Sequence, residues 1–398
     1  MSVPLNRLYR FLQDICNRDD LIIYRFFPDG SRKITDLSPV DPQDRRRPQW
    51  VMICHDQEPL DPEWFERPEH ALHWVSQLDR YYPQIHLYDK QNLIDLYSKL
   101  NLRMPATMPH FQSNLTPLKT MLLTHSEKRS PALDWYEKNL NFAGVYYWSH
   151  AVIARDWFRF AKYDPSLDVK NIDTDFLVYN RAWSGSREYR LKFAELLIDA
   201  GITQSCVMGF RNTDDNVHYT KHQYRNSELA IARTDLDEHF FNNQAASTAS
   251  ADYMAGDYQR TGIEVVLETL FDDARLHLTE KALRPIACGQ PFILAATAGS
   301  LEYMRSYGFE TFAPWIDETY DTIENPAQRL QAIVQEMKRI ANLDSEAKTK
   351  LYSELRNIAL RNKQLFFSDA WHAGIVDEFY QNFKHALLRE TNTRLQWR

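Results

Sequence analysis

The sequence predicts an α/β protein built from two facing, doubly wound (Rossmann-like) domains. Short apolar runs of strand length alternate with helical stretches along the chain, which is typical of layered α/β proteins. The 398 residues are enough for two domains that each bury a core of their own. A strand, turn and helix unit at 176–201 looks like the start of a second sheet. We therefore expect an N-terminal domain over 1–170, a second domain over 171–367 and a C-terminal helix over 368–398.

The first half contains apolar runs that predict four strands and a helix. The strands are expected at 21–27, at 50–54, from 117–123 to a polar end at 124–128, and at 145–150, followed by a helix at 154–160. Polar residues follow several of these strands. In α/β proteins ligands bind at the carboxyl ends of the strands, so these polar residues are candidates for function.

The second half begins with an expected strand at 176–181, a Gly/Ser turn at 182–186 and a helix at 187–200. The apolar residues of that helix recur at helical spacing, and Gly201 follows it as a helix C-cap does. The polar stretch 211–261 is expected to form loops or an insertion. The chain ends in a segment from about residue 369 whose apolar residues share one helix face.

The composition is that of a water-soluble globular protein, with 44% hydrophobic and 25% charged residues. The net charge of −7 gives no general attraction to nucleic acid or to an anionic membrane. No run of 18 apolar residues occurs, and the first residues lack the apolar core of a signal peptide, so we expect a cytoplasmic protein with no membrane partner. The four cysteines show no metal-binding spacing and are expected to be core thiols.

The segment Leu278-Thr279-Glu280-Lys281 carries an acid and a base directly before an expected short helix, which ends at Gly289 before a buried strand. A loop that runs into a helix places unpaired backbone N–H groups and the positive end of the helix dipole at one point. Here that point is Thr279, with Glu280 and Lys281 beside it. Such a point suits a phosphorylated ligand that carries a ribose.

This segment, with the following run Ala287-Cys288-Gly289-Gln290-Pro291-Phe292-Ile293, resembles the nucleotide-sugar loop of GT-B glycosyltransferases, including the fucosyltransferase-like branch. The similarity in sequence extends from Gly262 through Asp321. Over the rest of the chain only the pattern of strands and helices is similar. It implies a GT-B architecture, a UDP- or GDP-sugar as co-substrate, Glu280 on the ribose and Lys281 facing the diphosphate. It also implies that the C-terminal helix packs back on the N-terminal domain. The alternative is a helix–turn–strand corner of an ordinary α/β domain.

Four further residues are candidates for donor binding. Asn180 and Arg181 end the first strand of the second half, and Arg187 and Arg190 lie on the next helix. In the resembling family the corresponding turn faces the donor diphosphate, and an arginine there neutralises the charge on the leaving phosphate. Arg181 is the preferred candidate. Its alternative role is a surface ion pair.

Transfer of a sugar to a hydroxyl group needs a base that takes the acceptor proton. Asp56 and Glu58 follow the strand at 50–54 and are the candidates, with His55 next. Asp56 is equally well explained as the cap of a following helix. His150 and His125, at two other strand ends, are weaker candidates, because a histidine at a strand end is more often structural.

A metal-dependent reaction is not expected. Asp173-Thr174-Asp175 has the letters of a DxD metal motif but precedes its strand instead of following one, so both aspartates are interpreted as linker residues. Glu264 and Glu268 lie on an apolar segment, one to two turns apart if it is helical. Retaining members of the broader class carry paired glutamates, but Glu268 and Glu280 are spaced more widely than that pattern. The stereochemical outcome therefore stays open.

The identity of the sugar acceptor is inferred only from a resemblance to known enzymes. The His-Asp-Gln-Glu-Pro-Leu element at 55–60 and the Tyr-Asn-Arg strand end make the chain similar to phage glycosyltransferases, a class that modifies hydroxymethylated pyrimidines in DNA. The basic loop Arg45-Arg46-Arg47 fits a DNA backbone, whereas the overall acidity argues against DNA. A glycan, lipid-linked or protein acceptor is the alternative. A non-catalytic module that binds nucleotides or glycans is an alternative of another class.

Overall fold

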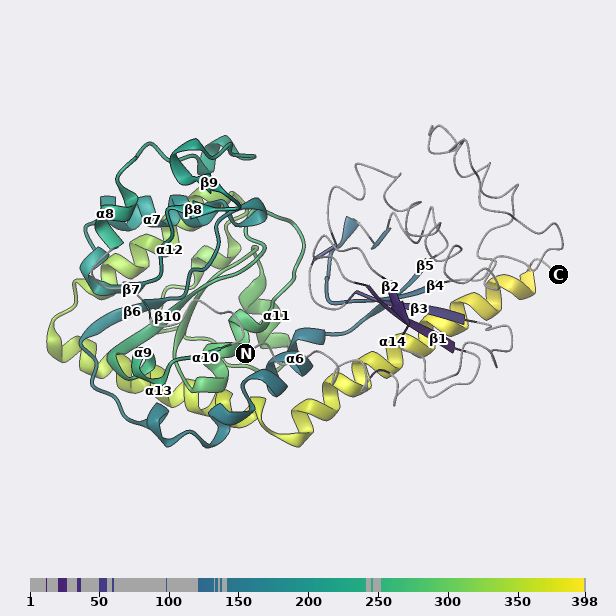
Figure 1. The fold of residues 1–398 in the computed structure, drawn as a ribbon. Helices are drawn as coiled ribbons and strands as arrows, with labels where there is room; N and C mark the ends of the chain where they lie inside the picture. The colour runs from purple at the N-terminus through teal and green to yellow at the C-terminus, as the bar shows by residue number, and fades with distance from the viewer. Residues whose placement is uncertain are drawn as a thin grey trace. The chain divides into compact units, whose positions relative to one another are not determined.

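The computed structural model describes the following residues: 12, 21–26, 34–36, 50–55, 59–60, 98, 121–131, 133–134, 137, 142–240, 245 and 252–396. The chain divides into two compact units (Figure 1). Unit 1 consists of Met1–Val3 and His150–Ala373, and unit 2 consists of Pro4–Ser149 and Gly374–Arg398. Each unit contains a mainly parallel sheet, so the predicted α/β class is confirmed.

The sheet of unit 1 has four parallel strands in the order β11-β10-β6-β7. Their bounds are β6 Thr174–Val178, β7 Cys206–Met208, β10 Thr261–Leu267 and β11 Phe292–Ala295. From β6 the chain moves outward to β7, and it later returns to β10 on the other side of β6. The strand order therefore reverses between β6 and β10, and the crevice at such a point is where open α/β sheets bind ligands.

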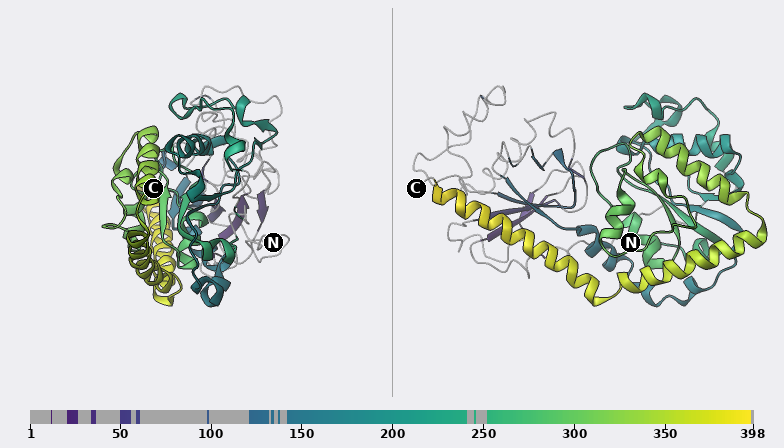
Figure 2. Two further views of the ribbon diagram at one scale, coloured as in Figure 1. Left: turned by 90° about the vertical axis from the view of Figure 1, so that its left-hand side faces the viewer. Right: turned by 180° about the vertical axis from the view of Figure 1, so that it is seen from behind.

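Helices cover both faces of this sheet, as Figure 1 and the two further views in Figure 2 show. Helix α7 (Tyr189–Ala200) packs against α12 (Pro326–Ala341), and α10 (Glu280–Cys288) packs against α13 (Ser345–Phe366). The other helices of the described part are α6 Ser149–Trp157, α8 Leu236–Phe240, α9 Ala255–Arg260, α11 Ser300–Ser306 and α14 Asp369–Gln396. Strands β8 (Thr213–Asp214) and β9 (Val217–His218) form a small antiparallel pair. None of the helices in the part described is long and apolar enough to cross a membrane.

The strands of unit 1 are stabilised by burial in its core. Every residue of β10 is buried, as expected for a parallel strand that is covered on both faces. Glu264 lies inside this strand, where its Oε1 is 2.5 Å from Nη2 of the equally buried Arg284. The segment that carries Glu264 is therefore a strand, so the spacing of one to two helical turns between Glu264 and Glu268 does not apply. Helix α7 ends at Gly201 in the left-handed conformation with φ 71°, which confirms the predicted C-cap.

Unit 2 contains a five-stranded sheet in the order β2-β1-β3-β4-β5, parallel except for β2. The strands are β1 Leu21–Phe26, β2 Ile34–Asp36, β3 Trp50–Cys54, β4 Met121–His125 and β5 Phe142–Tyr146. The later part of α14 belongs to this unit. Nδ2 of Asn382 donates to the carbonyl oxygen of Tyr146 at 2.8 Å, and Glu378 accepts from the backbone N–H of Trp148 at 3.3 Å.

Two predictions about local structure are wrong. The predicted strand at 145–150 ends at Tyr146, and α6 begins at Ser149, so His150 lies in a helix. Tyr147 and Trp148 suggested a strand by their β propensity, but they are buried in the turn between β5 and α6, where tertiary packing decides. Asp175 is not a linker residue. It lies within β6, 2.8 Å from Lys348 Nζ.

Candidate functional site

The carboxyl edge of the unit 1 sheet carries most of the residues predicted to bind a donor. Asn180 and Arg181 follow β6, whereas Thr279, Glu280 and Lys281 lie at the start of α10. All five belong to the same unit. Of the predicted catalytic residues, His150 also belongs to unit 1.

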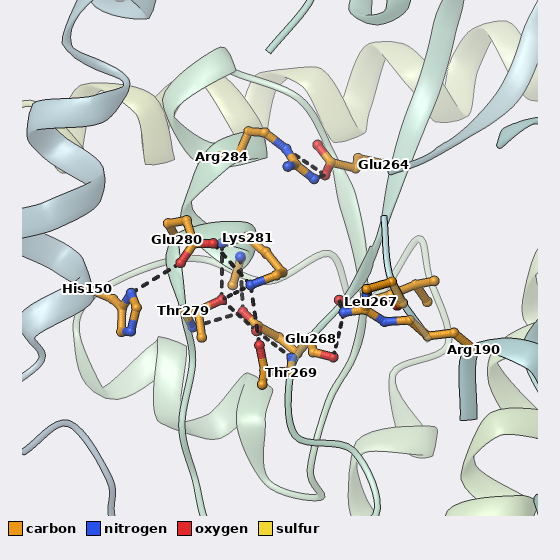
Figure 3. A network of polar contacts seen from close by, with 12 residues as sticks. His150, Arg190, Glu264, Leu267, Glu268, Thr269, Thr279, Glu280, Lys281 and Arg284 are labelled. Carbon is orange, nitrogen blue, oxygen red and sulfur yellow. Dashed lines mark hydrogen bonds and ion pairs between the residues drawn. The ribbon is translucent and has the colours of Figure 1, made fainter. Parts of the chain in front are cut away.

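Helix α10 begins where the sequence indicated. Thr279 is its N-cap with an extended backbone, and its Oγ1 accepts a hydrogen bond from the N–H of Lys281. Nζ of Lys281 lies 3.0 Å from Oε1 of Glu280, 3.1 Å from Oγ1 of Thr279 and 3.3 Å from Oγ1 of Thr269 (Figure 3). The ammonium group is therefore held over the first turn of the helix by three oxygens.

Glu280 links this lysine to His150. Its carboxylate is buried, and Oε2 lies 3.3 Å from Nδ1 of His150 on α6 (Figure 3). Burial by itself raises the pKa of the Glu280 carboxyl, but the adjacent Lys281 ammonium and the contact with His150 outweigh it and hold that pKa well below its ordinary value. A predicted catalytic residue and two predicted donor-binding residues therefore form one cluster, in which Glu280 is a carboxylate.

The N-terminus of α10 already binds an anion that belongs to the protein. Glu268, fully buried after β10, accepts through Oε1 from the N–H groups of Thr279 at 2.9 Å and Ala282 at 3.2 Å. Its Oε2 accepts from Oγ1 of Thr279 at 2.7 Å and from the N–H of Thr269 at 3.0 Å. Two of the backbone amides expected to face a phosphate are thus bonded to an internal carboxylate, which the helix dipole favours at this point.

In two other turns at this edge, backbone N–H groups are likewise bonded to a carboxylate of the protein. Oδ2 of Asp214 accepts from the N–H groups of Trp183 at 2.8 Å and Ser184 at 2.7 Å, in the turn after β6. Oδ2 of Asp321 accepts from the N–H of Leu301 at 3.0 Å, at the start of α11. A phosphate at this edge would therefore depend on cationic side chains more than on these amides.

Arg190 lies at the carboxyl ends of β6 and β10. Its buried guanidinium group donates to the carbonyl oxygens of Ala182 at 2.7 Å, Leu267 at 2.6 Å and Glu268 at 3.1 Å. The carbonyls belong to the end of β10 and to the turn after β6, so Arg190 joins these two segments. Arg190, a candidate for the diphosphate, is thus bonded to backbone carbonyls, and we assign it a structural role.

Several polar side chains lie at this edge of the sheet, and two of them have a buried atom without a hydrogen-bond partner among the described residues. Asn180 is 2% exposed, and its Oδ1 has no hydrogen-bond partner among the described residues. Arg181 is exposed and forms no ion pair with any residue that the structure describes. Arg187 is half-buried at the end of a short 3₁₀ helix, Gly185–Arg187. Oγ1 of Thr297, after β11, is also buried and unpartnered within the described ranges.

Sequence reasoning missed the roles of Glu268, Asp214, Asp321 and Thr297. Glu268 was considered only as a partner of Glu280 in a paired-glutamate pattern. The available signal was its position directly after the apolar run 265–267, because polar residues at the end of a strand point to the turn of the next βα unit. Thr297 had a similar signal, since it follows a buried strand and precedes Gly299 and a helix.

The remaining catalytic candidates belong to unit 2. Asp56 and Glu58, like the Arg45-Arg46-Arg47 loop, lie outside the described residues. His55 is buried after β3, and burial lowers its pKa to about 4. Burial likewise lowers the pKa of His125, at the end of β4, to about 3. Both imidazoles are therefore neutral near pH 7 and are weak bases.

Among the described residues, no group of three or more His, Cys, Asp or Glu side chains is arranged to hold a metal ion. Comparison of the chain with protein-family models, with curated proteins and with solved structures found no match.

Proposed function

We propose that the protein is a glycosyltransferase that moves a sugar from a UDP- or GDP-sugar to a hydroxyl acceptor, with the donor bound at the carboxyl edge of the unit 1 sheet. The observation that carries the proposal is Asn180, whose buried Oδ1 lacks a partner in the described part of the chain, next to the exposed Arg181. Both follow β6 beside the point where the strand order reverses. A buried acceptor and a cation at this place suit a ligand with a hydroxyl or amine donor and a phosphate.

The contacts suggest which residues bind each part of the donor. Asn180 accepts a hydrogen bond from the ribose or the base, and Arg181 with Arg187 neutralises the diphosphate. Because Glu268 takes amides at the α10 terminus, Lys281 supplies the positive charge there. Glu280 holds Lys281 and His150 in place, and it reaches the ribose, as the family resemblance implies, where its contact with His150 opens.

The acceptor part of the proposal comes from the resemblance alone. It takes hydroxymethylated pyrimidines in phage DNA as acceptors, Asp56 or Glu58 as the base, and a cytoplasmic reaction without a metal ion. A glycan, lipid-linked or protein acceptor is the alternative. Binding of a DNA acceptor would fall steeply between low and moderate salt because counterions are released, whereas a neutral sugar acceptor would be insensitive to salt.

Turnover of nucleotide sugars by the full chain tests the proposal. We expect release of UDP or GDP, slow without acceptor, and a loss of roughly tenfold or more in Arg181→Gln and Asn180→Leu, as expected for hydrogen bonds to charged or buried groups. Arg361→Gln is the matched control, since Arg361 lies on α13 and, among the described residues, pairs only with exposed Glu310. Tight nucleotide binding with no turnover would instead identify a non-catalytic binding module. Absence of both binding and turnover would refute the proposal.

A further inference from the structure

Lys170 is a half-buried lysine of unit 1 that takes no part in the site described above. It lies on the segment between a short 3₁₀ helix, Pro165–Asp168, and β6. The N–H of Asn171 donates to the carbonyl oxygen of Gln259 at 2.9 Å, which holds this segment against α9 (Figure 1). The position of the lysine is therefore fixed by the backbone on both sides of it.

The hydrogen bonds of Lys170 match those of an uncharged amine. Its Nζ donates to the carbonyl oxygen of Tyr258 at 2.5 Å and to Oε1 of Gln290. Both acceptors are uncharged oxygens, and Lys170 forms no ion pair with any residue that the structure describes. An ammonium group has three N–H donors, whereas an uncharged amine has two and a lone pair. The two acceptors thus satisfy both donors of the amine, and its lone pair remains for a reaction.

The surroundings of Lys170 favour the same state. Burial and the nearby guanidinium group of Arg356 lower the pKa of Lys170 to about 7. Burial raises the pKa of the neighbouring Cys288 thiol, which is therefore uncharged, and the side chain of Asp168 is 68% exposed to solvent. At pH 7 the uncharged fraction of Lys170 is about a thousandfold larger than that of an ordinary lysine. A desolvated lysine next to another cation is an activated nucleophile.

Two further cations converge on the same turn. Nη1 of Arg356 lies 3.5 Å from the carbonyl oxygen of Gly289, the residue before Gln290. The stem of Lys363 packs at this glycine, because a Cβ there would lie 3.3 Å from Cδ of the lysine. Arg356 and Lys363 are seven residues apart on α13 and therefore share one face of the helix.

The nearby acids leave these two cations able to bind an anion. Nη2 of Arg356 lies 3.4 Å from Oδ1 of the exposed Asp168, and such surface pairs are weak. Asp164 is already bonded, since Oδ1 accepts from the N–H two residues later and Oδ2 accepts from the hydroxyl of Tyr253, both at 3.0 Å. Lys363 forms no hydrogen bond or ion pair within the described part of the chain. A small anion would therefore find two cations beside an uncharged amine.

We propose that Lys170 is a modification site that is acylated by small acyl phosphates, whose phosphate group binds Arg356 and Lys363. Nζ attacks the acyl carbon and forms a C–N bond. The bond from that carbon to the phosphate oxygen breaks, inorganic phosphate leaves, and the amine gives up one proton to water. The resulting amide keeps one N–H group for the oxygen of Tyr258 or Gln290. The inference does not depend on the proposed glycosyltransferase activity, because it uses none of the residues of that site.

Incubation of the full chain with acetyl phosphate at pH 7, followed by peptide mass spectrometry over time, measures the acetylation rate at each lysine. Lys192 and Lys348 are the references, because Nζ lies 2.6 Å from Oε2 of Glu195 in the first and 2.8 Å from Oδ1 of Asp175 in the second. We expect Lys170 to react at least about tenfold faster than either reference, since its uncharged fraction is larger. A neutral acetyl thioester, which carries no phosphate, should show a smaller preference for Lys170.

Variants test the phosphate contact. Arg356→Gln and Lys363→Gln should each slow the reaction of Lys170 with acetyl phosphate by roughly tenfold, the effect of losing a charge-assisted hydrogen bond. Lys363→Gln should leave its reaction with the neutral thioester unchanged. Arg361→Gln is the matched control, since Arg361 lies on the same helix beside the exposed Glu310. An unmodified Lys170, equal rates at Lys170 and the two reference lysines, or equal effects of the three variants would overturn the inference.

Discussion

Replacement of Glu268 by glutamine tests the assignment of an internal anion at the α10 terminus. The carboxylate accepts four hydrogen bonds, two at each oxygen, from Thr279, Ala282 and Thr269. Glutamine has the same shape, but its NH₂ group cannot accept, so two donors lose their partner. With about 1.5–3 kcal/mol for each hydrogen bond to a charged group, the loss is roughly 3–6 kcal/mol, reduced because a buried charge is also removed. We expect the free energy of unfolding to fall by about 3 kcal/mol.

Urea-induced unfolding, followed by fluorescence, measures this change. Glu346→Gln is the control, since Glu346 is an exposed acid in the first turn of α13 and its substitution should change stability by less than about 0.5 kcal/mol. A companion variant, Glu268→Ala, vacates the site, so millimolar acetate should stabilise it more than it stabilises the wild type. A loss below about 1 kcal/mol in Glu268→Gln, with no acetate effect in the alanine variant, would refute the assignment.

Two further predictions concern stability. A Cβ at Gly262 would lie 2.5 Å from the Tyr352 ring, so Gly262→Ala should cost about 1–3 kcal/mol and lower Tm, whereas Gly256→Ala, with nothing within 4 Å, should leave Tm unchanged or raise it; equal effects would contradict this. His55 and His125 have pKa values of about 4 and about 3 in the folded protein, below the ordinary 6.5. The unfolded chain therefore binds more protons, and stability is lost as the pH falls from about 6.5 to about 4, by up to about 2.7 kcal/mol per pH unit for two groups. Urea midpoints across this range should show a shallower slope when both histidines are replaced by glutamine, and an unchanged slope would contradict the assignment.

The sequence allowed prediction of those parts of the fold that depend on local signals. Strand β3 was predicted at its observed bounds, because its run of apolar residues is short and sharply bounded. Gly201 ends α7, and Thr279 caps α10, since both roles depend on backbone conformation and on a neighbour within a few residues. That Asn180 and Lys281 would share one site was implied by the family resemblance and not by these local signals; in the structure Asn180 follows β6 and Lys281 lies at the start of α10.

Other features depend on contacts between distant residues and were not predictable from local pattern. Glu268 meets Thr279 eleven residues later only because β10 and α10 are packed together. The contact of His150 with Glu280 joins residues 130 positions apart. The helix at His150 was mistaken for a strand because aromatic residues favour strands in general but here fill a buried turn.

The most direct test of the central claim, a nucleotide site at the carboxyl edge of the unit 1 sheet, is isothermal titration of the full chain with UDP, GDP and their sugars. The account predicts saturable binding of one nucleotide series, weakened roughly tenfold by Arg181→Gln and by Asn180→Leu. It also predicts that Asn180→Leu leaves the ligand-free protein as stable as the wild type, because the oxygen it removes is buried and unpartnered among the described residues. No heat from either series, or affinities that these two substitutions leave unchanged, would contradict the claim.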